Sequence, residues 1–160
     1  ARNIVIFGMK PNSYFAEGLR WKFLSIGVSM QIAPYGEFGM VARTLTKDDC
    51  AIIISYSGQT KEMVEVAEIY HKRNIPFISI TCMAENSISR LADAHLFLSS
   101  REMLHIKIGD FASTTSLKYL FDILYAGVFS HDYKKNLETK IVVASYVDDR
   151  QSEDEYINEK

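Results

Sequence analysis

Short runs of apolar residues alternate along the chain with stretches in which apolar residues recur every three or four positions. The short runs are typical of strands buried on both faces of a sheet, and the periodic stretches are typical of amphipathic helices. Strands are predicted at residues 4–7, 28–33, 51–54, 76–81 and 94–98. Helices are predicted at residues 15–26, 38–45, 61–73, 86–92 and 111–129, whereas the pattern leaves the state of residues 141–143 open.

Strands that alternate with helices predict an α/β fold, because right-handed crossovers between such strands build a mostly parallel sheet. We expect a doubly wound, five-stranded parallel sheet with helices on both faces, which is a flavodoxin-like three-layer sandwich. In the strand order 2-1-3-4-5, the first and third strands are neighbours where the order reverses, and ligands of such sheets bind at that point. The loops at residues 8–13 and 55–60 should therefore face one crevice.

A hydroxyl-rich turn follows the third predicted strand. Its candidate residues are Ser55, Ser57, Gly58, Gln59 and Thr60, and a helical pattern begins directly after it. A glycine-containing turn that leads into a helix offers an anion main-chain N–H groups and the positive end of the helix dipole. The hydroxyl groups indicate a phosphate that is held by hydrogen bonds rather than by a metal. The alternative is an ordinary turn in which Thr60 caps the helix.

The loop after the first strand supplies three more candidate residues. Lys10 would neutralise a phosphate at the mouth of the crevice, or it is simply an exposed lysine. Asn12 and Ser13 can each donate and accept hydrogen bonds, so they are candidates for ligand contact, for capping of the first helix, or for both.

Composition excludes several classes of protein. A chain of 160 residues with 48% hydrophobic and 24% charged residues suits one soluble domain with a sizeable core. Its net charge of −2 provides no broad basic field for nucleic acid. Cys50 and Cys82 form no C-x-x-C pair, and the sequence has neither a membrane-length apolar run nor a signal-peptide pattern. We therefore expect a cytoplasmic protein without a metal, a cofactor or a membrane contact.

Charged residues are distributed unevenly along the chain. Residues 148–160 contain six acidic and two basic residues, a net charge of −4. We expect residues 1–138 to form one domain and residues 139–160 an acidic C-terminal tail, which is either solvated or a frayed last helix. Because the first predicted strand begins almost at the first residue, we also expect the chain to be a domain excised from a longer protein.

Several segments, in the same order and at matching spacing, resemble the SIS (sugar isomerase) domain. Residues 4–27 are similar to the first strand and helix of that family, residues 47–62 to its central S-x-S-G-x-T signature, and residues 78–102 to the segments that follow. Residues 120–125 resemble the closing helix of the SIS domain in RpiR/MurR-type transcriptional regulators. The resemblance covers residues 4–136. The first loop differs from the family pattern, which is usually G-x-G-x-S. Lys10 replaces the second glycine of that pattern, and Asn12 occupies the position of its serine.

The resemblance implies a site for a phosphorylated sugar. The residues implied to hold the phosphate are Ser55, Ser57 and Thr60, together with main-chain N–H groups around Gly58 and Gln59. The first loop would contribute a hydroxyl group, and Glu102 would face the sugar. Regulators of this type bind DNA through an N-terminal helix-turn-helix domain that is absent from this chain, so DNA contact is expected only through such a domain.

Two activities share this fold and ligand class. The expected function is an effector domain that senses a phosphorylated sugar without turnover in an RpiR-type transcriptional regulator, because no paired acid and base is evident. The alternative is a phosphosugar aldose–ketose isomerase with Glu102 as the general base at the sugar C2, and His105 lies three residues further on. An electron-carrying flavodoxin is disfavoured, because the flavodoxin phosphate loop follows the first strand rather than the third.

The predicted helices carry more apolar surface than their own core requires. Trp21 and the apolar residues of the segment 117–129 exceed what a small monomer exposes, so we expect a homodimer or a homotetramer. Ser113, at the start of the last predicted helix, is a candidate for ligand contact or for capping of that helix.

Overall fold

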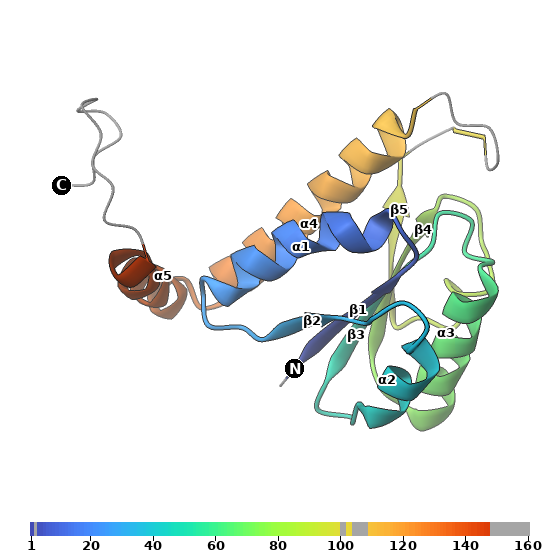
Figure 1. The fold of residues 1–160 in the computed structure, drawn as a ribbon, viewed down its shortest axis with the longest axis horizontal. Coiled ribbons are helices and arrows are strands. Elements are labelled where there is room, and N and C mark those ends of the chain that lie inside the picture. The colour runs from blue at the N-terminus through green and yellow to red at the C-terminus, as the bar shows by residue number, and fades with distance from the viewer. Residues whose placement is uncertain (2, 100–101, 104–108, 148–160) are drawn as a thin grey trace.

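A computed structural model describes residues 1, 3–99, 102–103 and 109–147 of the chain. Its centre is a five-stranded sheet in which neighbouring strands are parallel (Figure 1). The strands are β1 (Ile4–Gly8), β2 (Met30–Ile32), β3 (Cys50–Ile54), β4 (Phe77–Cys82) and β5 (Ala94–Leu98). Their order across the sheet is β2-β1-β3-β4-β5, which confirms the predicted α/β class and strand order.

Within the described residues, the helices are α1 (Asn12–Leu24), α2 (Phe38–Thr44), α3 (Lys61–Arg73), α4 (Phe111–His131) and α5 (Tyr133–Val147). α1 and α4 lie side by side on one face of the sheet, whereas α2 and α3 cover the opposite face (Figure 1). α5 follows α4 and lies beyond the sheet. In these described ranges, none of the helices has the length and apolarity that crossing a bilayer requires.

The side chains of β1 and β3 alternate between two apolar layers. Val5 and Phe7 pack in the layer beneath α2 and α3, whereas Ile6 packs in the layer beneath α1 and α4. Ile53 and Ile54 divide between the two layers in the same way. Because both faces of these strands are covered, each strand is a continuous apolar run rather than an alternation of apolar and polar residues.

The helix predicted at residues 86–92 is wrong, because this segment forms successive turns. Asn86 Oδ1 accepts a hydrogen bond from the N–H of Ser89 at 3.0 Å, and the N–H of Asn86 donates to Ser89 Oγ at 3.0 Å. This reciprocal pairing is the one found at the start of many helices, but here it is followed by turns over residues 87–91 and not by a helix. The segment is therefore a turn-rich connection between β4 and β5, and its Ile88 is buried in the core.

Residues 141–143, whose state the apolar pattern leaves open, lie within α5. The same helix runs across residue 138, the expected end of the domain, so residues 139–147 of the expected tail are helical, while residues 148–160 lie outside the described part. Asn136 Nδ2 donates to the main-chain oxygens of Val128 and Phe129 at 3.1 Å each. These contacts join the first turn of α5 to the end of α4.

Candidate functional site

The carboxyl ends of β1 and β3 open into a cleft of about 280 Å³. Its walls come from the loop after β1, the turn after β3 and the first turn of α4. The polar side chains that line it are those of Asn12, Ser55, Tyr56, Ser57, Thr60, Asp110, Ser113 and Thr114. The two loops expected to share a crevice do so, because β1 and β3 are adjacent parallel strands.

The turn between β3 and α3 is held together by its own hydrogen bonds. Ser55 Oγ lies 2.9 Å from Thr60 Oγ1, and the N–H of Gly58 donates to the main-chain oxygen of Ser55 at 3.0 Å. The N–H of Gln59 donates to Ser57 Oγ at 3.2 Å. Gly58 has a φ of +64°, a left-handed conformation that favours glycine. These local hydrogen bonds and the glycine at position 58 favour this shape of the turn.

Thr60 occupies the N-cap position of α3, but its side chain makes no capping hydrogen bond. Its hydroxyl group pairs with Ser55 instead, so the capping contact of an ordinary turn is not made. The first turn of a helix carries N–H groups without partners inside the helix, and it attracts negative charge. Because the hydroxyl-bearing residues Ser57 and Thr60 line the cleft beside this turn, the arrangement can bind an oxyanion such as phosphate.

The first turn of α4 already holds a carboxylate. Glu102 Oε1 accepts hydrogen bonds from the N–H groups of Ala112 at 2.8 Å and Ser113 at 3.1 Å. Ser113 Oγ donates to Glu102 Oε2 at 2.5 Å. The charge of Glu102 is stabilised there, because the N-terminus of a helix carries partial positive charge. Glu102, expected to face a sugar, thus caps α4 in this structure, and Ser113 takes part in that cap.

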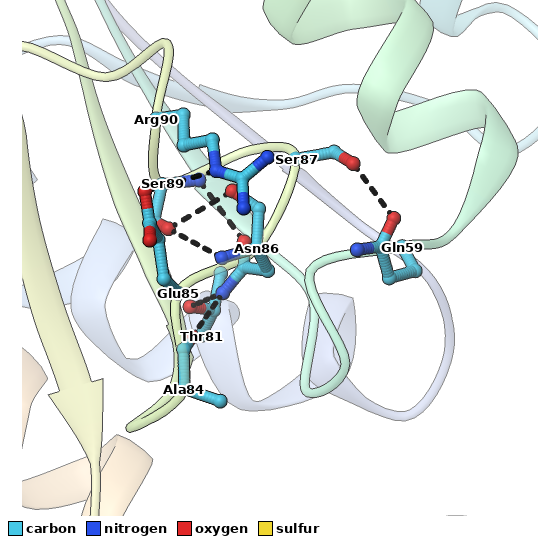
Figure 2. Close-up of polar contacts among 8 residues, drawn as sticks. All are labelled: Gln59, Thr81, Ala84, Glu85, Asn86, Ser87, Ser89 and Arg90. Atoms are coloured by element: carbon cyan, nitrogen blue, oxygen red, sulfur yellow. Dashed lines mark hydrogen bonds and ion pairs between the residues drawn. The ribbon is translucent and has the colours of Figure 1, made fainter.

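Several other predicted site residues lie outside the cleft. Gln59 is directed to the β4–β5 connection, where its Oε1 accepts a hydrogen bond from Ser87 Oγ at 2.8 Å (Figure 2). Lys10 and Ser13 line a neighbouring hollow of about 180 Å³. His105 lies outside the described residues. The structure therefore brings together Asn12, Ser55, Ser57, Thr60 and Ser113 from the predicted set.

The expected capping of α1 by Asn12 or Ser13 is wrong. The N-cap residue is Pro11, and α1 begins at Asn12. Pro11 has a φ of −86° and a ψ of −4°, which is close to a helical conformation. The N-cap position therefore falls on Pro11, one residue before the polar side chains that usually occupy it. Asn12 lines the cleft instead.

Sequence patterns missed several residues of the site. Tyr56, Asp110 and Thr114 line the cleft, and Asn86 packs behind the turn at Gly58. Of these residues, only Asp110 could have been found from sequence. An aspartate directly before a helical pattern is a common N-cap residue, which places Asp110 at the start of α4. Among the side chains that the structure describes, no group of three or more His, Cys, Asp or Glu is arranged to hold a metal ion.

Comparison with known proteins matches residues 1–120 to the SIS domain. Two relatives are uncharacterised HTH-type transcriptional regulators: CPE0189 of Clostridium perfringens, 25% identical over 148 residues, and YbbH of Bacillus subtilis, 26% identical over 137 residues. These matches cover 92% and 84% of this chain but 53% and 48% of the regulators, so the chain spans about half their length. Arabinose 5-phosphate isomerase KdsD of Escherichia coli O157:H7 is 30% identical over 127 residues, which cover 76% of this chain and 38% of KdsD.

Solved structures share the fold. The Vibrio vulnificus NanR protein, complexed with ManNAc-6P, has a TM-score of 0.80 and 25% identity over 92% of this chain and 55% of its own. The sugar isomerase domain of an RpiR transcription factor from Sphaerobacter thermophilus has a TM-score of 0.76 and 19% identity over 91% of this chain and 79% of its own. With the sheet order, the turn after β3 and these matches in agreement, the chain belongs to the SIS domain family.

Proposed function

We propose that this chain is the sugar-phosphate-sensing effector domain of an RpiR-type transcriptional regulator and that it binds its ligand without turnover. The observation that carries the proposal is the position of Glu102, whose carboxylate accepts three hydrogen bonds from Ala112 and Ser113. Both oxygens of this carboxylate accept hydrogen bonds from the first turn of α4, so the contact gives Glu102 the role of a helix cap. An isomerase, in contrast, needs a general base within reach of the sugar C2. The HTH-type regulators among the relatives support the same conclusion.

The phosphate group would bind at the turn between β3 and α3. Ser57 and Thr60 would donate hydroxyl hydrogen bonds, and the first turn of α3 would add main-chain N–H groups and its dipole. Ser55 is 3% exposed and orients Thr60. The sugar would extend toward Asn12 and the first turn of α4. The cleft volume of about 280 Å³ is close to the roughly 300 Å³ of the smallest ligand pockets, which suits one phosphorylated monosaccharide.

DNA binding would belong to another part of the full regulator. The HTH-type relatives are about twice as long as their matched segments, so their remaining half has room for an N-terminal helix-turn-helix domain. The present domain would bind the sugar phosphate and pass the resulting change of shape to that DNA-binding domain.

A thermal-shift screen over phosphorylated sugars and phosphorylated amino sugars tests the proposal. A ligand at 100 times its Kd stabilises the folded state by about 2.7 kcal/mol, which is easily measured. For the strongest ligand, calorimetry should show that Ser57→Ala and Thr60→Ala each lose about 1.5–3 kcal/mol of binding free energy. Thr44→Ala removes an exposed hydroxyl group on α2 and is the matched control. Unchanged affinity in both turn variants would contradict the phosphate position.

A phosphosugar isomerase is the second candidate, because KdsD is 30% identical over 76% of this chain. The two functions separate in an NMR experiment with arabinose 5-phosphate and hexose phosphates. The sensor proposal predicts binding without aldose–ketose interconversion. Rapid interconversion that is abolished by Glu102→Gln would replace the sensor proposal with an isomerase.

A further inference from the structure

Asn86, in the connection between β4 and β5, packs directly behind the turn that follows β3. Asn86 is buried, with 3% of its surface exposed. A Cβ atom placed on Gly58 would lie 2.0 Å from both Cγ and Oδ1 of Asn86, so the carboxamide fills the space that a larger residue at position 58 would need. Glycine is therefore required at position 58 for two reasons, its φ of +64° and its contact with Asn86.

Three hydrogen bonds, one to β4 and two within its own connection, hold the Asn86 side chain (Figure 2). Nδ2 donates to Thr81 Oγ1 at 2.7 Å and to the main-chain oxygen of Ala84 at 2.9 Å, and Oδ1 accepts from the N–H of Ser89 at 3.0 Å. These partners determine which way the amide points, because the Ala84 oxygen can only accept and the Ser89 N–H can only donate. The plane of the carboxamide is thereby fixed against the turn.

A second contact reaches the next residue of the turn. Ser87 Oγ donates to Gln59 Oε1 at 2.8 Å (Figure 2). Thr81, which anchors Asn86, is itself buried in β4, and its Oγ1 lies 2.8 Å from Nε2 of His95 in β5. The β4–β5 connection therefore links two strands of the sheet to two consecutive residues of the turn, Gly58 and Gln59.

We propose that Asn86 is a positioning residue of the phosphate site, which keeps the turn around Gly58 in its binding conformation before a ligand arrives. The inference rests on the proposed function for the nature of the ligand, an oxyanion at that turn. A turn that is already ordered loses little conformational entropy on binding, so it binds more tightly than a turn that the ligand must order. Asn86 acts through Gly58, because its own side chain lies behind the turn.

Hydrogen exchange measured by NMR tests this role without any ligand. Asn86→Ala removes the support behind Gly58, so the Gly58 N–H, which bonds to Ser55, should exchange about tenfold faster. The N–H of Ile53 in β3 reports global stability in the same spectra and should change less. Arg90→Gln is the matched control, because Arg90 pairs with Glu85 on the exposed side of the same connection. Equal Gly58 exchange in Asn86→Ala and wild type overturns the inference.

Titration with inorganic phosphate measures the consequence for binding. Asn86→Ala should weaken phosphate binding about tenfold, since the turn must then be ordered by the ligand. Gly58→Ala should weaken it further, because the added methyl group displaces either the turn or Asn86. In the Gly58→Ala, Asn86→Ala double variant part of the affinity should return, because the methyl group enters the space left by the carboxamide. If the fold-loss of phosphate affinity in the double variant equals the product of the losses in the two single variants, the two residues are not coupled, and the proposal is refuted.

The proposed function and the role of Asn86 fail in different ways. If wild-type protein binds no phosphate or sugar phosphate, the proposed function fails, and exchange at Gly58 still decides the role of Asn86. If Ser57→Ala weakens phosphate binding and Asn86→Ala does not, only the role of Asn86 fails. Ser87→Ala removes just the contact with Gln59 and is the milder variant if Asn86→Ala does not fold. It should raise the exchange rate of the Gln59 N–H severalfold, and an unchanged rate counts against the proposal.

Discussion

The hydroxyl group of Tyr56 donates a hydrogen bond to the main-chain oxygen of Glu102 at 2.7 Å, although the two residues lie 46 positions apart. Tyr56 belongs to the turn after β3, and the Glu102 carboxylate caps the first turn of α4. The contact therefore connects the two helix N-termini that face the cleft. α4, whose first turn Glu102 caps, lies beside α1 (Figure 1).

Tyr56→Phe removes this hydrogen bond and keeps the aromatic ring. We expect faster hydrogen exchange at the N–H groups of Ala112 and Ser113, because their acceptor Glu102 loses one of its anchors. Loss of one hydrogen bond corresponds to about 1 kcal/mol, or roughly fivefold faster exchange. NMR measures the rates, with the N–H of Ile53 as the internal reference. Equal rates in the variant and the wild type would show that Tyr56 does not hold Glu102 in place.

Asp49 is a buried carboxylate with three hydrogen-bond donors. Its Oδ2 accepts from the N–H and the hydroxyl group of Thr46 at 2.8 and 2.9 Å, and its Oδ1 accepts from Asn3 Nδ2 at 2.8 Å. The main-chain hydrogen bond from Thr46 is the largest cause that lowers the pKa of Asp49, and burial opposes it. The folded state thus favours the charged form. This stabilisation is present above the ordinary pKa of 3.8 and is lost as the pH falls below that value.

Asp49→Asn should lower the free energy of unfolding at pH 7 by about 1–3 kcal/mol, because an amide cannot satisfy all three donors and can place its own N–H group against them. The difference from wild type should shrink as the pH falls below 3.8, where the wild-type carboxylate takes up its proton. Urea denaturation at several pH values measures both effects. Glu65→Gln, at an exposed carboxylate on α3, is the control. A difference that stays constant with pH would count against the assigned role of the Asp49 charge.

We expect His95 to make the stability of the fold depend on pH below 6.5. Burial lowers its pKa below the ordinary value of 6.5, so the unfolded chain takes up a proton at a higher pH than the folded protein does. Stability should therefore be complete above pH 6.5 and decline as the pH falls below it. His95→Gln keeps a hydrogen-bonding group near Thr81 and should reduce this decline. Thermal unfolding across this pH range checks the prediction, and an equal decline in both proteins would refute it.

Exposed apolar side chains on the face formed by α1 and α4 predict self-association. Trp21 and Leu24 on α1 are 67% and 56% exposed, and Tyr119 and Ile123 on α4 are 64% and 45% exposed. Burial of such side chains by a second copy would remove apolar surface from water. Sedimentation velocity should show a dimer or tetramer that Ile123→Glu dissociates. Met40→Glu, on the exposed surface of α2 at the opposite face, should leave the assembly intact. A wild-type protein that is monomeric at all concentrations would refute the prediction.

Local patterns were sufficient for most of the fold. Apolar runs such as residues 51–54 predicted the strands, because a strand covered on both faces must be apolar throughout. They failed at residues 86–92, where the hydrogen bonds between Asn86 and Ser89 resemble a helix start but are followed only by turns over residues 87–91. The apolar pattern did not predict the state of residues 141–143, which lie in α5. The contacts of Asn136 that join this helix to α4 depend on packing, and a local repeat of apolar residues does not reveal them.

The strands and the turn from Ser55 to Thr60 were predictable from neighbouring residues, because an apolar run, a glycine between hydroxyl-bearing residues and a helix start are visible in local sequence. The packing of Asn86 against Gly58 and the capping of α4 by Glu102 became apparent only in three dimensions. The same holds for the hydrogen bond from Tyr56 to Glu102. These contacts join residues that lie 10 to 46 positions apart in the sequence. Their formation depends on how the strand ends and helices are placed in space, and no local spacing of residues encodes that placement.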